Sequence, residues 1–229
     1  MKSSFRWYGD SDPVTLDKIR QIPGMRSIVS AVYDVKPGEV WPEESIKHLV
    51  DECREHGLIF DVVESIPVTE EIKLGRPGRD RHIENYCESI RRCAKYGIKC
   101  VTYNFMPVFD WTRTELDRRR EDGSTVMAYN QEAIDQMDPE KMFDAIKDDM
   151  NGTVMPGWEP ERMEKVKELF ELYKDIDEDK LFDNLKYFLE AIMPVCNKYD
   201  INMAIHPDDP GWSVFGLPRI ISSQEKLKR

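Results

Sequence analysis

The segment PEESIKHLVDECREHGLIFDVVES, residues 42–65, decides the fold class of this chain. Its first half has apolar residues at the spacing i, i+3, i+4 and i+7, namely Ile46, Leu49, Val50 and Cys53. This spacing predicts an amphipathic helix with one buried face. Gly57 is then expected to end the helix, and LIFDVVES, residues 58–65, has the composition of a buried strand. The segment therefore predicts a helix, a tight stop and a strand in direct succession.

Two later segments repeat this pattern. The apolar helical faces are formed by Ile83, Cys87, Ile90 and Ala94 in one copy and by Leu181, Leu185, Leu189, Ile192 and Cys196 in the other. The first helix is expected to end at Gly97, before a strand over residues 99–106. The second is expected to end near Asp200, before the strand INMAIHP at residues 201–207. The recurrence indicates a repeated β/α unit.

Two more strands are expected upstream, at residues 5–8 and 27–33, with a short helix at residues 13–21 between them. Strands that alternate with helices at this spacing lie parallel and are joined by right-handed crossovers. The sequence therefore predicts an α/β fold with about five strands, built as a single domain over residues 1–229.

Residues 107–178 interrupt the rhythm after the fourth expected strand. They contain two further helical patterns, near residues 139–150 and 160–174, and a basic run at residues 118–120 that is expected to lie in a solvated loop. A long excursion at the carboxyl end of a strand is typical of lids and substrate loops in α/β proteins. We expect an insertion or lid here.

The composition excludes several classes of function. The chain has 229 residues, 33 Lys and Arg against 44 Asp and Glu, and a net charge of −11, which argues against nucleic acid as a partner. No apolar run approaches the roughly 20 residues that cross a bilayer, and MKSSFRWYGD lacks the apolar core of a signal peptide. We therefore expect a cytoplasmic protein with no membrane partner. The five cysteines form no CxxC pair and are expected to be reduced thiols.

Polar and aromatic side chains gather where the expected strands end, which is where parallel α/β folds bind ligands. These positions are Arg6, Trp7, Tyr8, Asp34, Glu64, Asn104, His206, Asp208 and Asp209. His206 ends an apolar strand and precedes a rigid Pro-Asp-Asp-Pro turn, so it is either a metal ligand or a hydrogen-bonded strand-end histidine. Glu64 is either a ligand or base, or a solvated strand terminus.

Asp110, Trp111 and Arg113 lie within four residues of the segment FDWTR. A guanidinium beside an aromatic ring suits a substrate carboxylate, and a surface Arg–Asp pair is the alternative. Trp7 could line a binding wall or belong to the core. No GxGxxG, GxxxxGK[ST] or GxSxG signature is present, which disfavours nucleotide binding and the usual serine hydrolases. The pattern points to a small-molecule site, with metal assistance.

Several blocks of sequence resemble bacterial mannonate dehydratase of the hexuronate degradation pathway. They are FRWYGDSDPVTLDKIRQIPG, YDVKPGEVWP, ESIPVTEEIKLGRPGRDRHIENY, YNFMPVFDWTRTEL and NMAIHPDDPGWSVFGLPRI. The resemblance spans nearly the whole chain. It implies a TIM (β/α)8-type barrel like that of xylose isomerase, and a lyase that dehydrates D-mannonate to 2-keto-3-deoxy-D-gluconate with Mn²⁺ or Fe²⁺.

The same resemblance implies which residues bind the metal and the substrate. His206 matches a metal-ligating histidine of the family, whereas the remaining ligands and the acid and base groups are expected beyond Arg229. The expected substrate-binding residues are Trp7, Asn104, Asp110, Trp111 and Arg113. A family member has eight strands, so about five β/α units would form a partial barrel, which implies either a C-terminal truncation or strands from another chain. A homo-oligomer is expected for this reason.

Two alternatives to the dehydratase remain open at this point. A sugar isomerase or epimerase could use the same barrel, because a fold does not determine the chemistry. A catalytically inactive fragment is the other alternative.

Overall fold

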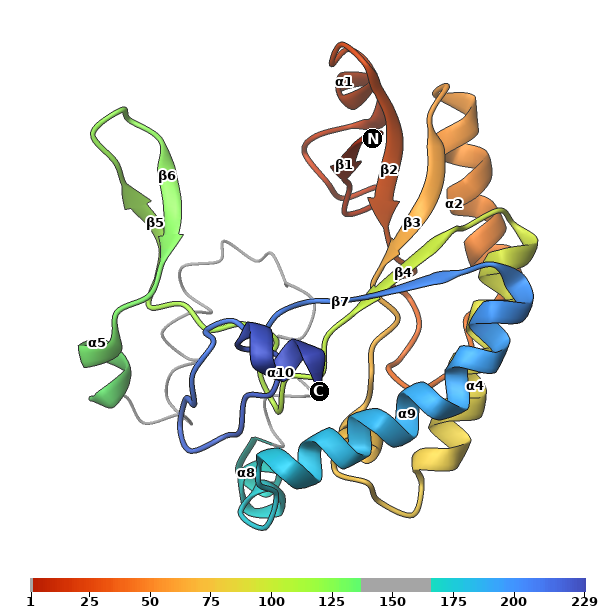
Figure 1. Cartoon of the computed structure of the whole chain (residues 1–229). Coiled ribbons are helices and arrows are strands. Elements are labelled where there is room, and N and C mark those ends of the chain that lie inside the picture. The colour runs from red at the N-terminus through yellow and green to blue at the C-terminus, as the bar shows by residue number, and fades with distance from the viewer. Residues whose placement is uncertain (1, 137–165) are drawn as a thin grey trace. The chain divides into compact units, whose positions relative to one another are not determined.

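The computed structural model of the chain describes residues 2–136 and 166–229, which form two compact units (Figure 1). The first unit comprises Met1–Phe105 and Asp183–His206, and the second comprises Met106–Phe182 and Pro207–Arg229. The expected insertion, residues 107–178, falls in the second unit together with the C-terminal segment.

A five-stranded parallel sheet forms the centre of the first unit, in the order β1-β2-β3-β4-β7. Its strands are β1 (Ser3–Arg6), β2 (Met25–Ser30), β3 (Ile59–Glu64), β4 (Cys100–Tyr103) and β7 (Asn202–Ile205). All five expected strands are present, and each begins or ends within three residues of its expected bounds. Because every pair is parallel, the carboxyl ends of these strands lie at one edge of the sheet.

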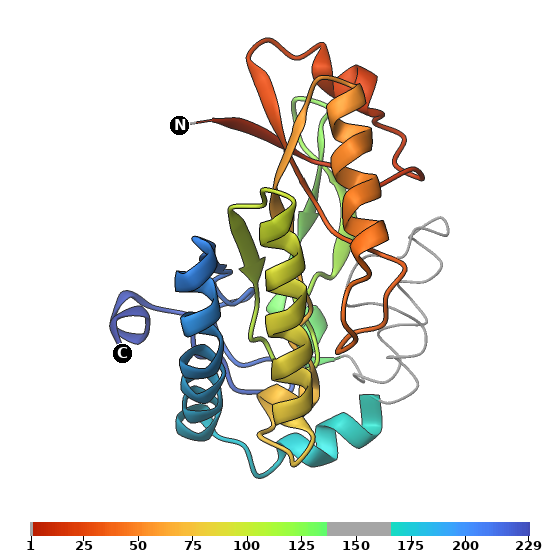
Figure 2. The ribbon, with the colours of Figure 1, turned by 90° about the vertical axis from the view of Figure 1, so that its right-hand side faces the viewer.

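Helices connect the strands of the first unit. They are α1 (Leu16–Arg20), α2 (Glu43–Glu55), α3 (Glu70–Lys73) and α4 (Arg79–Lys95), and the last connection ends with α9 (Glu178–Tyr199). Figure 2 shows α2, α4 and α9 running along the same face of the sheet. Gly57 and Gly97 have φ of 70° and 87°, which is the left-handed conformation expected after a helix. Asp200 ends α9 in the same way, with φ of 55°.

The core of this unit contains an aromatic cluster that joins α4 and α9 to the sheet. Phe188 of α9 is 0% exposed. Its ring centroid lies 5.1 Å from that of Tyr86, 5.9 Å from that of Tyr103 and 6.1 Å from that of Phe105. Large rings at these separations exclude water and add edge-to-face attraction to the burial of apolar area.

The second unit contains an antiparallel hairpin that sequence analysis did not predict. Strands β5 (Glu115–Arg119) and β6 (Thr125–Ala128) pair across a turn in which the amide of Arg120 donates to the Ser124 carbonyl. The expectation of a loop is therefore wrong for Arg118 and Arg119, which lie in β5, whereas Arg120 lies in the turn, and all three side chains are exposed as expected. The Asp122–Gly123 dipeptide, with Gly123 at φ of 83°, was the available signal, since Asp-Gly favours hairpin turns.

Among the described residues, three helices lie entirely within the second unit: α5 (Gln131–Asp135), α8 (Val166–Tyr173) and α10 (Gln224–Lys228). Helix α8 lies within the second helical pattern of the insertion, and the first pattern, residues 139–150, lies outside the described residues. In the described part of the chain, no helix has the length and apolar character needed to cross a membrane.

All five cysteines are free thiols. Burial raises the pKa of the Cys53 and Cys93 thiols to about 12, so both remain protonated at neutral pH.

Candidate functional site

Three strands of the parallel sheet bring charged side chains together at its carboxyl edge. Arg6 ends β1, Glu64 ends β3, and His206 directly follows β7. The amide of His206 donates to the carbonyl of Tyr103 at 2.8 Å, which extends the ladder between β4 and β7 by one residue. The imidazole is thereby carried at the end of the strand, where sequence analysis expected it.

The carboxylate of Glu64 lies between the other two side chains. Its Oε1 is 3.6 Å from Nε2 of His206, and its Oε2 is 3.4 Å from Nε of Arg6. The side chains of His206 and Glu64 are 43% and 36% exposed, so a ligand can reach both from solvent. An exposed imidazole is a nitrogen donor that suits Mn²⁺ or Fe²⁺, and a neighbouring carboxylate can orient such a ring. The residues at this edge therefore fit a divalent cation.

Arg6 is fixed by the main chain around it. Its Nη1 donates to the Trp7 carbonyl at 3.0 Å and to the Tyr33 hydroxyl at 2.6 Å, and its Nη2 donates to the Glu64 carbonyl at 2.6 Å. The guanidinium carbon also lies 4.5 Å from the ring centroid of Tyr8. With both terminal nitrogens committed to these acceptors, Arg6 links the strand ends to one another.

Two expected substrate-binding residues also belong to the first unit. Trp7 is 3% exposed, and its carbonyl accepts from the Ser30 hydroxyl at 2.7 Å, which places the residue in the core. Asn104 directly follows β4 and is half-buried. A substrate contact by either residue stays a prediction.

In the second unit, the predicted residue Arg113 is engaged by an acid from the C-terminal segment. Nη1 of Arg113 donates to Oδ1 of Asp209 at 2.9 Å, and Nη2 donates to the other oxygen of the same carboxylate. The guanidinium carbon lies 5.6 Å from the ring centroid of Trp111, which itself forms a parallel β-bridge with Asp209. Sequence analysis selected Arg113, Trp111 and Asp209 separately, but nothing in their spacing indicated that they contact one another.

Sequence analysis missed a second arginine of this unit. Arg219 is 1% exposed, and its Nη1 donates to the Phe109 carbonyl at 3.4 Å. Burial lowers the pKa of Arg219, and burial raises the pKa of Asp208, whose Oδ2 accepts from the amides of Ile220 and Ile221 at 2.6 and 2.9 Å. No local pattern predicts such burial, because GLPRI resembles an ordinary loop.

The remaining histidines have local partners. Nε2 of His48 is 3.8 Å from Oε2 of Glu52, and Nδ1 of His56 is 2.8 Å from Oδ1 of Asp17. Among the described residues, one group of three potential metal ligands meets the distance requirement, and it is Asp10, His48 and Glu52. This group is largely exposed and does not include His206, so it does not bear on the site at the strand ends.

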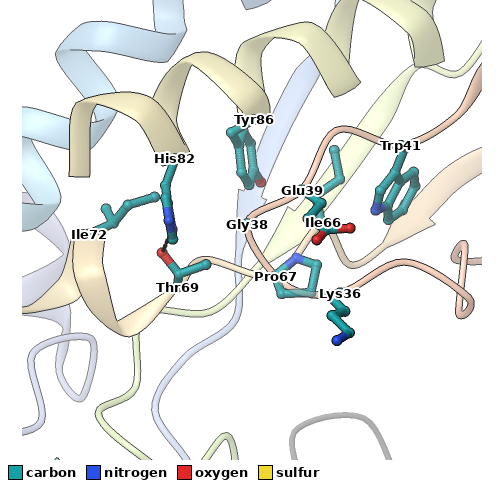
Figure 3. A pocket seen from close by; sticks show the side chains of 10 residues that line it. All are labelled: Lys36, Gly38, Glu39, Trp41, Ile66, Pro67, Thr69, Ile72, His82 and Tyr86. Atoms are coloured by element: carbon teal, nitrogen blue, oxygen red, sulfur yellow. Dashed lines mark hydrogen bonds between the residues drawn. The ribbon is translucent and has the colours of Figure 1, made fainter. Parts of the chain in front are cut away.

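A small cavity of the first unit lies beside His82 (Figure 3). The Thr69 hydroxyl is 2.7 Å from Nδ1 of His82, and Figure 3 shows the two side chains directed toward one another. The cavity has a volume of about 10 Å³, far below the roughly 300–1,000 Å³ of ordinary ligand pockets. It is therefore too small to be the principal substrate pocket.

The contact between Arg113 and Asp209 makes a thermodynamic prediction. We expect Arg113→Ala and Asp209→Ala to be coupled in a double-mutant cycle by about 1 kcal/mol, because a two-point charge-assisted contact that is partly buried is stronger than an exposed pair. Urea unfolding of the wild type, both single variants and the double variant measures this coupling. The exposed pair Arg118 and Glu115 of the hairpin is the control, with an expected coupling of a few tenths of a kcal/mol. Equal coupling for the two pairs would refute the prediction.

Comparison with known proteins decides the family. A family model described as "D-mannonate dehydratase (UxuA)" matches residues 1–229. This chain belongs to the D-mannonate dehydratase family. The resemblance seen in the sequence is thus confirmed, and the parallel α/β sheet agrees with a TIM-like fold.

Two members of the D-mannonate dehydratase family illustrate the similarity. The chain is 54% identical over 230 residues to a mannonate dehydratase of Brachyspira hyodysenteriae and 54% identical to one of Geobacillus thermodenitrificans. Both alignments cover 100% of this chain, but 65% and 62% of the two relatives. The crystal structure of mannonate dehydratase from Streptococcus suis serotype 2 matches with a TM-score of 0.87 and 48% identity, covering 100% of this chain and 59% of that one. The chain therefore spans less than two thirds of the length of these proteins.

Proposed function

We propose that this chain acts as a mannonate dehydratase, a hydro-lyase that removes water from D-mannonate to give 2-keto-3-deoxy-D-gluconate. The observation that carries the proposal is sequence identity of 54% to proteins of that name across the whole chain. The cluster of Arg6, Glu64 and His206 supports it, because it lies at the sheet edge where parallel α/β enzymes carry out their chemistry. This proposal favours dehydration over isomerisation or epimerisation.

The proposed architecture is more detailed than the observed parallel sheet. The five strands and their helices are proposed to be the first five β/α units of a TIM (β/α)8-type barrel in a single partial domain, residues 1–229. Residues 107–178 are proposed to act as an insertion or lid. The similarity to the S. suis dehydratase structure supports this assignment.

The proposed cofactor is Mn²⁺ or Fe²⁺, with His206 as a ligand. When bound, the cation stabilises negative charge that develops on carboxylate or hydroxyl oxygens of the substrate. His206 offers a nitrogen donor at the end of β7, and Glu64 places a carboxylate oxygen 3.6 Å from that ring. The side chain of His206 is exposed enough to meet a ligand from solvent.

The elimination of water requires two proton transfers. A base removes the proton from C2, beside the substrate carboxylate, and an acid protonates the hydroxyl that leaves C3 as water. The resulting enol then gains a proton at C3, loses the proton of its C2 hydroxyl and becomes the 2-keto-3-deoxy acid. The residues proposed to bind and orient the sugar acid are Trp7, Asn104, Asp110, Trp111 and Arg113. Arg113 would act together with its partner Asp209, because that carboxylate already occupies two of its donors.

The biological setting is also proposed. A sugar acid is the small-molecule partner, the pathway is hexuronate degradation within carbohydrate metabolism, and the compartment is the cytoplasm. The protein is proposed to form a homo-oligomer, without nucleic acid or membrane partners. The net charge of −11 supports the exclusion of nucleic acid.

An assay of product chemistry tests this function. The folded chain is incubated with D-mannonate and Mn²⁺, and the 2-keto-3-deoxy acid is quantified. Its formation supports the dehydratase, because an isomerase or epimerase yields a product with the same composition as its substrate. A folded sample that releases only an isomer, or no product, rejects the proposed activity for this chain.

A further inference from the structure

The carboxylate of Glu64 contacts two side chains at once, Arg6 and His206. The proposed function gives His206 a role as metal ligand but gives no role to these two contacts. One carboxylate oxygen faces Nε of Arg6 at 3.4 Å, and the other faces Nε2 of His206 at 3.6 Å. The three residues come from β1, β3 and the end of β7, so each is positioned by a different strand of one sheet.

The two terminal nitrogens of Arg6 have acceptors other than the carboxylate of Glu64. Main-chain carbonyls of Trp7 and Glu64 and the hydroxyl of Tyr33 already accept from its two terminal nitrogens. The ring of Tyr8 lies against the guanidinium at 4.5 Å. The positive charge is thus held rigidly. Its remaining nitrogen, Nε, makes no hydrogen bond but lies 3.4 Å from Oε2 of Glu64, so the guanidinium attracts this carboxylate by charge.

The fixed carboxylate constrains the proton on the neighbouring imidazole. A separation of 3.6 Å is longer than a hydrogen bond, so the interaction is electrostatic. A carboxylate oxygen repels a nitrogen lone pair and attracts an N–H group at this distance. Neutral His206 is therefore stabilised with its proton on Nε2, which leaves the lone pair on Nδ1.

We propose that Arg6 and Glu64 are positioning residues for His206, holding its imidazole as the Nε2–H tautomer and leaving Nδ1 to bind the divalent cation. The assignment of a cation to His206 rests on the proposed function, whereas the tautomer follows from the contacts alone. Metal-binding histidines commonly donate their second ring N–H to a carboxylate, and loss of such a partner weakens metal affinity about 10–100-fold.

Nitrogen-15 NMR of the full chain tests the proposal without metal or substrate. At a pH where histidine is neutral, the wild type is expected to show His206 protonated at Nε2. In Glu64→Gln, the amide is expected to keep its oxygen toward Arg6 and to present its N–H₂ group to the ring. The preferred tautomer should then invert to Nδ1–H. A conservative Glu64→Asp variant retains the charge and should restore the Nε2–H form.

The same variants are then titrated with Mn²⁺ and followed by electron paramagnetic resonance. Glu64→Gln is expected to weaken Mn²⁺ binding about 10–100-fold, and Glu64→Asp to recover part of the loss. Glu43→Gln is the matched control. It removes the same charge from a carboxylate that pairs with Lys95, away from the strand ends, and should leave both readouts unchanged. Arg6→Lys, which keeps the charge but loses Nε, should shift the tautomer in the direction of Glu64→Gln.

The results of these experiments distinguish a failure of the positioning role from a failure of the proposed function, on which the cation assignment rests. An Nδ1–H tautomer in the wild type, or the same tautomer in the wild type and Glu64→Gln, overturns the positioning role even if the chain dehydrates D-mannonate. Metal bound through Nε2 also overturns it, since Glu64 and His206 would then face one cation as joint ligands. The expected tautomers without dehydration would support the positioning role and reject the proposed function.

Discussion

Replacing His206 with alanine is expected to abolish stoichiometric Mn²⁺ binding and to lower kcat/KM for D-mannonate at least about 100-fold. The imidazole offers a nitrogen donor at the end of β7, and alanine has no group that can take its place. Because a metal ion contributes several kcal/mol to stabilising charge in a transition state, its loss is costly. Metal analysis of the dialysed protein and steady-state kinetics measure both effects.

The matched control for this variant is His56→Ala. His56 pairs with Asp17 and lies away from the strand ends, so its removal should leave the metal content and kcat/KM unchanged. Undiminished metal content in His206→Ala would exclude His206 as a ligand. Thermal unfolding of both variants checks that any loss does not come from unfolding, since His206 is partly exposed and its removal should leave no large cavity.

Phe188→Ala is expected to destabilise the chain by about 3–5 kcal/mol. Phe188 is 0% exposed and contacts the aromatic rings of Tyr86 in α4, Tyr103 in β4 and Phe105, two residues beyond β4. Truncation removes the buried ring and leaves a cavity that rigid neighbours can fill only in part. Urea unfolding followed by circular dichroism gives the change in free energy.

Two companion variants define the origin of this loss. Phe188→Leu retains much of the apolar volume and should cost less than half as much as alanine. Lys186→Ala, on an exposed position of the same helix, should stay within about 0.5 kcal/mol of the wild type. A small effect of Phe188→Ala would contradict the packing of α9 against the sheet described above.

The repeated β/α units were predictable because their signal is local. Each copy has apolar residues at helical spacing, a Gly or Asp stop and a short apolar strand, and the observed strands follow these segments closely. The hairpin of β5 and β6 escaped prediction because β5 is polar, β6 is short and both are largely exposed, so no apolar alternation marks them.

The candidate site was predictable only in its location. Parallel strands bring their carboxyl ends together, and this rule selected nine strand-end positions that include Arg6, Glu64 and His206. It did not indicate that Glu64 faces both of the others, because that depends on side-chain directions at the ends of three strands. The pairing of Arg113 with Asp209 joins residues 96 positions apart, which no local spacing encodes.

Turnover of D-mannonate by this chain tests the central claim most directly. The measurement quantifies 2-keto-3-deoxy-D-gluconate after incubation of the folded, Mn²⁺-loaded wild type, with His206→Ala as a parallel sample. The account predicts product from the wild type and at least about 100-fold less from the variant. A folded wild type that forms no 2-keto-3-deoxy acid, or an equally active His206→Ala protein, would contradict it.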